Sequence, residues 1–233
     1  MSVITLQMYK KWHIFAIQMN CGQQSASDCY KSIASASKGI YKDKGSKFLA
    51  FAYPVTSESQ VKDLVSGIKK EYFDARHHCW AYRLGHTGGQ FRYNDDGEPS
   101  STAGKPIYGQ ILSNNLSDIL IVVVRYFGGI LLGTSGLIVA YKSAAADAIA
   151  NATIIEKIAT VRYQVSFDYS QMNSVMKCLK DFQLPVEEPV FDNQCTLITS
   201  IRLSSETSFL EAIKDKCNKV SPFPGGRDLE QAP

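Results

Sequence analysis

A short run that is almost entirely apolar, DILIVVVRYF over residues 118–127, constrains the fold more than any other part of this chain. The run is rich in β-branched residues and is bounded by an aspartate and a glycine, so it predicts a buried strand. The segment RYFGGILLGTSG (125–136) then places four glycines ahead of an apolar, alanine-rich stretch. That stretch predicts a helix over about 135–151, with Thr134 or Ser135 as its N-cap.

The glycine-rich loop between this strand and this helix has two interpretations. Free backbone N–H groups and the positive end of the helix dipole can bind a phosphate group. Alternatively, the glycines let the helix pack closely against the sheet. The loop is not a Walker loop, because Gly128 and Gly133 are followed by Thr134 rather than by lysine, and it also lacks G-x-G-x-x-G. Spacing alone leaves both interpretations open.

The composition indicates a globular protein of one large or two small domains. The chain has 233 residues, of which 45% are hydrophobic and 20% charged, and its net charge of +3 is too small to indicate nucleic-acid binding by itself. None of the six cysteines lies in a C-x-x-C pair, so we expect reduced thiols and a cytoplasmic location. No run reaches the roughly 18–20 apolar residues of a membrane span. Residues 1–27 make a poor signal peptide and are expected to be a loose extension, with Met19 as an alternative start.

Alternation and turn residues predict three further strands before the buried run, at 46–55, 78–84 and 90–93. A helix is predicted between the first two, because apolar residues keep helical spacing and Ser57 with Gln60 forms a capping box. The polar stretch NDDGEPSSTAGKP (94–106) is rich in turn residues and predicts no regular structure.

The pattern changes near residue 155. Strict alternation over 161–169 predicts a strand, and the segments after it predict a helix, two strands around an Asp192–Asn193 turn, and a second helix. This β-α-β-β-α order is of the split-βαβ type, an α+β sandwich with its helices on one face. The tail, residues 221–233, is rich in proline and glycine and is expected to be flexible. We therefore expect two α+β domains that are joined near 152–158.

Adjacent histidines stand out in ARHHCWAYRLG (75–85). His77 and His78 could bind a metal or transfer protons. Adjacent side chains on a strand point to opposite faces, however, so a packing role with hydrogen-bonded histidines is favoured.

Three carboxylates fall within four residues of the polar stretch: Asp95, Asp96 and Glu98. They could hold Mg²⁺ or Ca²⁺ through oxygen ligands, although the spacing is not that of an EF-hand. A turn also explains the N-D-D-G sequence, because Asn and Asp tolerate left-handed backbone, and it is favoured over a metal site.

Lysines crowd into KGIYKDKGSKF (38–48), with Tyr41 and Phe48 between them. Lysines interleaved with aromatic residues suit the phosphates and bases of a nucleic acid. A solvated charged face is the alternative interpretation. The lysines of this basic segment are Lys38, Lys42, Lys44 and Lys47.

In their order along the chain, YKDKGSKFLAF, ARHHCWAYRLG, NDDGEPSSTAGKPI and VVVRYFGGILLGTSGLIVAY resemble the YigZ/IMPACT family of conserved cytosolic proteins. The resemblance covers about residues 30–220 and implies an α+β fold in two domains. The first, at 28–152, would be an IMPACT-type domain similar to the second domain of a small-subunit ribosomal protein. The second, at 153–220, would be a smaller ferredoxin-like domain similar to the last domain of elongation factor G.

The resemblance implies a nucleic-acid- or ribosome-binding module linked to the regulation of translation. Its partners would be RNA, the ribosome or a translation-regulating protein, and no membrane. The resemblance implies neither an enzymatic activity nor a cofactor. The alternative function is an enzyme or sensor in which four side chains converge on a small phosphorylated ligand or on Mg²⁺. The four are His78, Asp96, Glu98 and Arg125.

The resemblance also implies a shared binding surface in the first domain. Where many relatives carry lysine or arginine this chain has Val139, which removes a cation beside the glycine-rich loop. Ser101 and Ser135 stand where many relatives have glycine. The implied surface comprises His78, Tyr82, Asp96, Gly97, Glu98, Thr102, Gly104, Arg125, Tyr126, Gly128, Gly129, Gly133 and Gly136.

Overall fold

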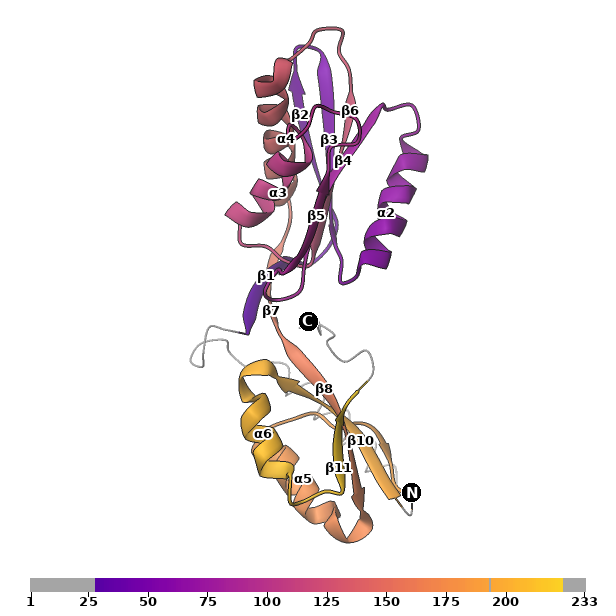
Figure 1. Cartoon of the computed structure of the whole chain (residues 1–233), viewed down its shortest axis with the longest axis vertical. Helices are drawn as coiled ribbons and strands as arrows, with labels where there is room; N and C mark the ends of the chain where they lie inside the picture. The colour runs from indigo at the N-terminus through magenta and orange to yellow at the C-terminus, as the bar shows by residue number, and fades with distance from the viewer. Residues whose placement is uncertain (1–27, 193, 224–233) are drawn as a thin grey trace. The chain divides into compact units, whose positions relative to one another are not determined.

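The chain divides into two compact units in the computed structural model, which describes residues 28–192 and 194–223 (Figure 1). The first unit is Tyr30–Glu156, and the second contains residues 157–223 together with 28 and 29. Both units mix helices with antiparallel sheet, so the predicted α+β class is confirmed. The assignment of 28–152 and 153–220 to two named domain types stays a prediction.

The first unit is built on a five-stranded sheet in the order β2-β3-β6-β4-β5, with every neighbouring pair antiparallel. A further pair, β1 (Cys29–Ile33) and β7 (Ile154–Ile158), forms a separate two-stranded sheet. The strands of the main sheet are β2 (Ser37–Asp43), β3 (Ser46–Pro54), β4 (His77–Leu84), β5 (Gln90–Asn94) and β6 (Ile119–Tyr126).

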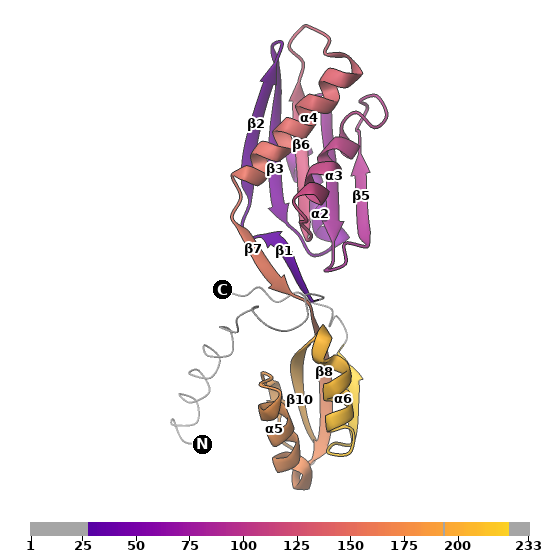
Figure 2. The same ribbon diagram turned by 90° about the vertical axis from the view of Figure 1, so that its left-hand side faces the viewer.

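The buried run forms β6, the central strand, and both of its faces are covered. Helix α2 (Glu58–Glu71) covers one face of the sheet, while α3 (Gly104–Ser113) and α4 (Gly133–Ala150) cover the other (Figure 2). Alternate residues of β6 enter the two cores, with Val123 facing α4 and Val122 facing α2. Burial on both sides explains why an antiparallel strand lacks the usual polar alternation.

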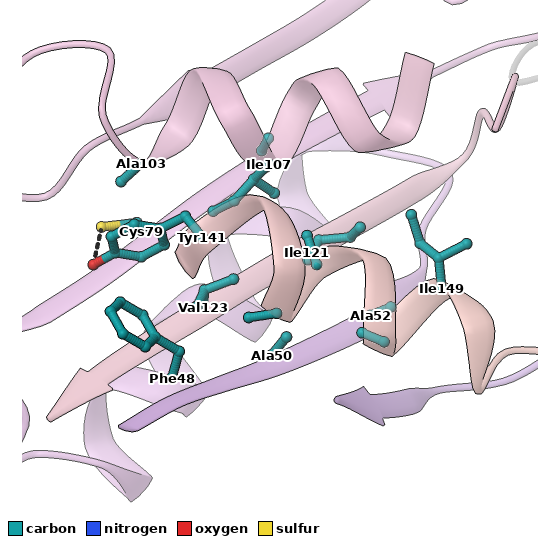
Figure 3. Close-up of a cluster of buried hydrophobic side chains, with 14 of the residues drawn as sticks. Phe48, Ala50, Ala52, Cys79, Ala103, Ile107, Ile121, Val123, Tyr141 and Ile149 are labelled. Atoms are coloured by element: carbon teal, nitrogen blue, oxygen red, sulfur yellow. Dashed lines mark hydrogen bonds between the residues drawn. The ribbon is translucent and has the colours of Figure 1, made fainter. Parts of the chain in front are cut away.

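Small residues let α4 approach the sheet closely. Ala50 and Ala52 of β3 lie beneath α4, with Ala52 on the side of Ile149 and Phe48 of the same strand next to the ring of Tyr141 (Figure 3). Gly39 of β2 permits the closest approach, since an added β-carbon would overlap the backbone of α4 at Ala148. The close packing of helix on sheet is therefore made by glycine and alanine of the strands.

The first helix follows its prediction almost residue by residue. The Ser57 hydroxyl accepts a hydrogen bond from the Gln60 N–H at 3.3 Å, as expected of an N-cap. The Gln60 side chain accepts in turn from the Thr56 N–H at 2.8 Å, one residue earlier than in a standard capping box.

Two predictions for the other helices are wrong. Helix α3 begins inside the stretch that predicts no regular structure, and the cap predicted for α4 is not formed, although α4 itself is confirmed at Gly133–Ala150. Thr134 and Ser135 lie within α4, where neither caps it, because Leu132 occupies the N-cap position without a side-chain bond. The N-cap residue of α3, Ala103, makes no side-chain cap hydrogen bond either.

The second unit has the ferredoxin-like strand order β11-β8-β10-β9, antiparallel throughout, with apolar residues of β8 and β10 packed against two helices. Tyr169 was expected to continue the first strand, but it lies beyond its end and is 72% exposed. The elements are β8 (Thr160–Asp168), α5 (Met172–Asp181), β9 (Glu187–Val190), β10 (Gln194–Arg202), α6 (Glu206–Ile213) and β11 (Lys219–Pro222).

The flexible tail predicted at 221–233 is wrong for residues 221 and 222, which belong to β11 and pair with β8. The rest of that tail from residue 224, the extension at 1–27 and Asn193 of the predicted turn lie outside the described residues. None of the helices in residues 28–192 and 194–223 is long and apolar enough to cross a membrane.

Candidate functional site

The stretch from Asn94 to Gly104 is an ordered turn held by one carboxylate. Asp95 Oδ1 accepts hydrogen bonds from the backbone N–H groups of Ala103 and Gly104 at 3.0 and 2.8 Å, and its Oδ2 accepts from Ser101 at 2.9 Å. Asp95 therefore caps the N-terminus of α3 from eight and nine residues away. A carboxylate committed to three N–H groups is not a free metal ligand.

Asp96 turns from the same loop toward α2. Its carboxylate contacts the Lys69 ammonium at 2.7 Å and accepts from the His78 backbone N–H at 2.8 Å. Partial burial favours the neutral acid, but these two hydrogen bonds and the charge of Lys69 outweigh it and lower the pKa of Asp96 below its usual value. Asp96 itself has a φ of +41°, in the left-handed region that Asn and Asp tolerate.

His78 is buried and fully engaged within the first unit. Its Nε2 lies 3.0 Å from the Tyr72 carbonyl, which can only accept, so this nitrogen carries the proton of that bond. Its Nδ1 lies 3.6 Å from the Asp96 carboxylate. His77 points the other way, with Nδ1 2.9 Å from the Asp96 carbonyl. The two histidines thus hold the loop from opposite sides.

Glu98 enters the opposite core and meets a buried cation. Its Oε1 lies 2.6 Å from an Arg125 guanidinium nitrogen and 2.8 Å from the Tyr141 hydroxyl, which donates to it. The side chains of Glu98 and Arg125 are only 3% and 8% exposed. The guanidinium also lies 5.5 Å from the ring centre of Phe48, while its Nε is buried without a hydrogen-bond partner.

The Cys79 thiol extends this buried network. Its sulfur lies 3.3 Å from the Tyr141 hydroxyl and 3.0 Å from the Asp95 carbonyl (Figure 3 shows the contact with Tyr141). Burial raises the pKa of the Cys79 thiol and of the Tyr141 hydroxyl well above their ordinary values, so both stay protonated. A protonated, buried thiol is a poor nucleophile, and the network is a structural one.

The sheet separates the four residues of the predicted small-ligand site into two pairs. In the register of β4 with β6, His77 lies opposite Arg125 and His78 lies opposite Val124, so His78 and Arg125 point to opposite faces. Asp96 accompanies His78, and Glu98 accompanies Arg125. Among the residues that the structure describes, no group of three or more His, Cys, Asp or Glu is arranged to hold a metal ion.

Two tyrosines of the predicted surface are anchored by carboxylates on the α2 side. Tyr82 is buried and donates to Glu58 at 2.7 Å; its burial, with this hydrogen bond, raises its pKa to about 12. Tyr126 donates to Asp74 at 2.8 Å, and that hydrogen bond is the main reason why its pKa also lies at about 12.

The remaining predicted residues of the polar loop shape its backbone. The Thr102 hydroxyl donates to the Pro99 carbonyl at 2.6 Å. A β-carbon at Gly104 would lie 2.8 Å from the Asn94 backbone nitrogen, so glycine is required for this close approach. Gly97 has a φ of +86°, which favours glycine at the turn.

The glycine-rich loop after β6 packs against the turn of the hairpin between β2 and β3. A β-carbon at Gly128 would overlap the backbone of Gly45 and Ser46, and the Gly128 N–H donates to the Ser46 hydroxyl at 3.2 Å. Gly129 and Gly133 have φ angles of +89° and +71° in open space. At Gly136 a β-carbon would lie 3.0 Å from that of Leu132.

The basic segment forms a tight hairpin. Lys44 and Gly45, with φ angles of +44° and +78°, make the two-residue turn that ends at Ser46. Lys42 of β2 lies directly opposite Lys47 of β3.

Three lysines of this hairpin share one face of the sheet. Lys38 and Lys42 lie on that face by strand alternation, and Lys47 joins them because it is paired with Lys42. We call these three residues the lysine face. The stacking role expected of Phe48 is wrong, because Phe48 points to the other side and is fully buried. Tyr126, which is paired with Lys47, supplies an aromatic ring on the lysine face instead.

Residue-pattern reasoning missed Lys69 and Tyr141. Tyr141 is a single tyrosine on the apolar side of a helix, where a packing role is the usual expectation, and Lys69 is one of several lysines in α2. Neither carries a sequence motif that could have linked it to the polar loop.

Comparisons with known proteins identify relatives in the IMPACT family. The family model "Impact N-terminal domain" matches residues 44–149. An IMPACT family member of Haemophilus influenzae is 32% identical over 175 residues, covering 74% of this chain and 85% of that protein. The family member YvyE of Bacillus subtilis is 30% identical over 181 residues, covering 78% of this chain and 83% of YvyE. A crystal structure described as that of a hypothetical protein matches with a TM-score of 0.63 at 28% identity, covering 81% and 92% of the two chains.

Proposed function

The chain belongs to the IMPACT family, and from this premise we propose that its first unit binds nucleic acid through the lysine face, as a cytoplasmic module that takes part in the regulation of translation. The link to translation comes from the family resemblance. The choice of nucleic acid as the ligand, and of the surface that binds it, comes from the charges of the hairpin.

The observation that carries the proposal is the direct pairing of Lys42 with Lys47. Like charges directly opposite each other destabilise a sheet. The only carboxylate in β2 and β3 is that of Asp43, which follows Lys42 and therefore points to the other face. A phosphate backbone laid along the lysine face would supply the missing negative charge.

Lysines on an edge strand often serve only to prevent another strand from pairing there. That purpose is already met at β2, because α4 occupies its outer edge. The Ile40 N–H donates to Asp147 at 2.8 Å, and the Asn151 side chain donates to the Lys38 carbonyl at 2.9 Å. Since the edge is closed by α4, the lysines are available for another role.

The second unit offers a weaker surface for nucleic acid. RNA-binding sheets of ferredoxin-like order stack bases on aromatic residues of the helix-free face. In the described strands of this unit, the aromatic residues Tyr163 and Phe167 point into the helix-covered core. The described strands therefore place no aromatic residue on the helix-free face, where Phe223, directly after β11, has its ring 5.0 Å from the Arg162 guanidinium.

The proposal is tested by titrating a fluorescein-labelled RNA hairpin with the full chain across a salt series, using fluorescence anisotropy. Each phosphate contact contributes about 0.7–0.9 to the slope of log affinity against log salt. The double variant Lys42→Gln/Lys47→Gln should therefore lower that slope by roughly 1.4–1.8.

Lys142→Gln serves as the matched control, because Lys142 is an exposed lysine of α4, which covers the opposite face of the sheet. It should leave the slope unchanged. Absence of any binding by the unmodified chain at low salt would refute nucleic-acid binding. Equal slopes for the double variant and the unmodified chain would refute the assignment to the lysine face.

A further inference from the structure

The two edges of the five-stranded sheet differ in their state of closure. At β2, Asp147 of α4 accepts from the Ile40 N–H, and Asn151, directly after α4, donates to the Lys38 carbonyl. At β5, all five residues are exposed. Within residues 28–192 and 194–223, no hydrogen bond joins the backbone of residues 90–93 to any element other than β4. Figure 2 shows β5 at the side of the sheet away from β2.

From this contrast we propose that β5 receives an extended segment of a partner polypeptide, which adds to the sheet as a sixth strand. An unpaired row of backbone donors and acceptors is a template for such pairing, and main-chain hydrogen bonds supply most of the affinity in this mode of recognition. The inference does not depend on the proposed binding of nucleic acid, because the lysine face belongs to the opposite edge.

An aromatic cluster beside the open edge indicates the chemistry of one side of that partner strand. Phe91 and Tyr93 project on the α3 side and are 47% and 41% exposed. Both rings stack on Tyr108 of α3, with ring centres 4.7 and 6.0 Å apart. Because the rings are held in place by α3, they form a preformed apolar surface for alternate side chains of an added strand.

The other side of the partner strand should carry negative charge. Arg92 is the only charged residue of β5, and it lies opposite Tyr82 on the α2 side. The Glu58 carboxylate on this side is already bonded to the Tyr82 hydroxyl, with which Arg92 also interacts. An acidic residue of the added strand beside Arg92 would complete a cross-strand pair of opposite charge.

Arg92 also makes a second copy of this chain an unfavourable partner for the β5 edge. If two copies paired antiparallel about the middle of β5, Arg92 would lie directly opposite its own counterpart, and like charges in that position are destabilising. The partner is therefore a different polypeptide whose apolar and acidic residues alternate.

The test uses the full chain and a labelled ten-residue peptide of alternating valine and glutamate. Binding is measured by fluorescence anisotropy, and amide hydrogen exchange locates it. We expect the peptide to slow exchange in residues 90–94 and to leave residues 37–43 unchanged. A peptide of the same sequence whose alternate backbone nitrogens are methylated should not bind, because it cannot donate to the edge.

Charge exchange at Arg92 provides the matched variant. Arg92→Glu should lower the affinity for the valine–glutamate peptide at least tenfold and raise the affinity for a valine–lysine peptide. Loss of folding cannot produce this opposite pair of changes. Lys42→Gln/Lys47→Gln should leave peptide binding unchanged, which separates this inference from the proposed nucleic-acid binding. Failure of the peptide to slow exchange in residues 90–94 at millimolar concentration would overturn the inference. Dimers of the chain in which amide exchange of β5 is slowed without any peptide would also overturn the inference.

Discussion

At the scale of single residues, the polar loop shows that three carboxylates close in sequence need not share a ligand. Asp95 caps α3, Asp96 binds Lys69 and His78, and Glu98 pairs with Arg125 in the opposite core. Each carboxylate is satisfied by a different element. The loop therefore acts as a clamp that ties β4, β6 and the helices together, and its charges are structural.

The Glu98–Arg125 pair allows a direct test of this clamp. Glu98→Gln keeps the size of the side chain but leaves the Arg125 charge buried without its partner, which should lower the free energy of unfolding of the first unit by about 3–5 kcal/mol. Urea unfolding followed by Trp80 fluorescence in a Trp12→Phe background measures this value. The double variant Glu98→Gln/Arg125→Met should lose much less free energy of unfolding than the sum of the losses of Glu98→Gln and Arg125→Met measured singly. A loss below about 1 kcal/mol for Glu98→Gln would contradict the buried-pair account.

Asp96 predicts a dependence of stability on pH. Its pKa is lower in the folded chain than the unfolded value of about 3.9, so its ionised form stabilises the fold above that pH. This contribution is lost as the pH falls through the folded-state pKa. Asp96→Asn should therefore cost about 1 kcal/mol at pH 7, since Lys69 is partly solvated, and progressively less as the pH falls through the folded-state pKa.

Urea unfolding at several pH values between about 2 and 8, which extend well below the unfolded pKa, measures the Asp96 contribution. Lys69→Met is the companion variant, and it should remove part of the same pH dependence while leaving the bond from the His78 N–H in place. A stability difference between Asp96→Asn and the unmodified chain that stays constant over the whole pH range would rule out this explanation.

At the scale of elements, the contact between β2 and α4 depends on glycine in the strand. Gly39→Ala places a methyl group against the α4 backbone at Ala148, so it should lower the free energy of unfolding by about 2 kcal/mol or more. Gly67→Ala is the matched control, because Gly67 lies in α2 with nothing within 4 Å of an added β-carbon. It should raise the free energy of unfolding by about 0.5–1 kcal/mol through helix propensity. A neutral Gly39→Ala, measured by the same urea titration, would exclude close backbone packing there.

The sequence was most informative where a pattern is local. The apolar run predicted β6, helical spacing with Ser57 predicted α2, and alternation predicted β8. Helix α3 could not be predicted in this way, because its cap comes from Asp95, eight and nine residues away, rather than from a neighbouring residue.

The candidate site was less predictable than the elements that carry it. The sequence predicts that His78, Asp96, Glu98 and Arg125 converge on one small ligand, whereas the structure places them in two pairs on opposite faces of the sheet. Their division into two pairs depends on the register of β4 with β6, which places His78 and Arg125 on opposite faces. Register across two strands joined through other elements is a tertiary property, so residue spacing could not reveal it.

At the scale of the whole molecule, the first unit carries both proposed surfaces on one sheet. The lysine face lies at the β2 side, and the open edge is β5 at the other end of the strand order. A polyanion and an extended peptide could therefore be bound together, since neither surface shares a residue with the other. The second unit contributes its own core, made only of residues from 161 onward.

Separate cores predict separate responses to substitution. Phe209 is fully buried in the second unit and packs edge-on against Phe182 at 5.6 Å, so Phe209→Ala should lower the stability of that unit by about 3–5 kcal/mol. Amide hydrogen exchange should then accelerate in β8 and β10 while the protection of β6 stays unchanged. RNA binding at low salt should also persist, because the lysine face lies in the first unit. An equal loss of protection in β6 would mean that the two units unfold as one cooperative body, and the proposed surfaces could then not be assigned to the first unit alone.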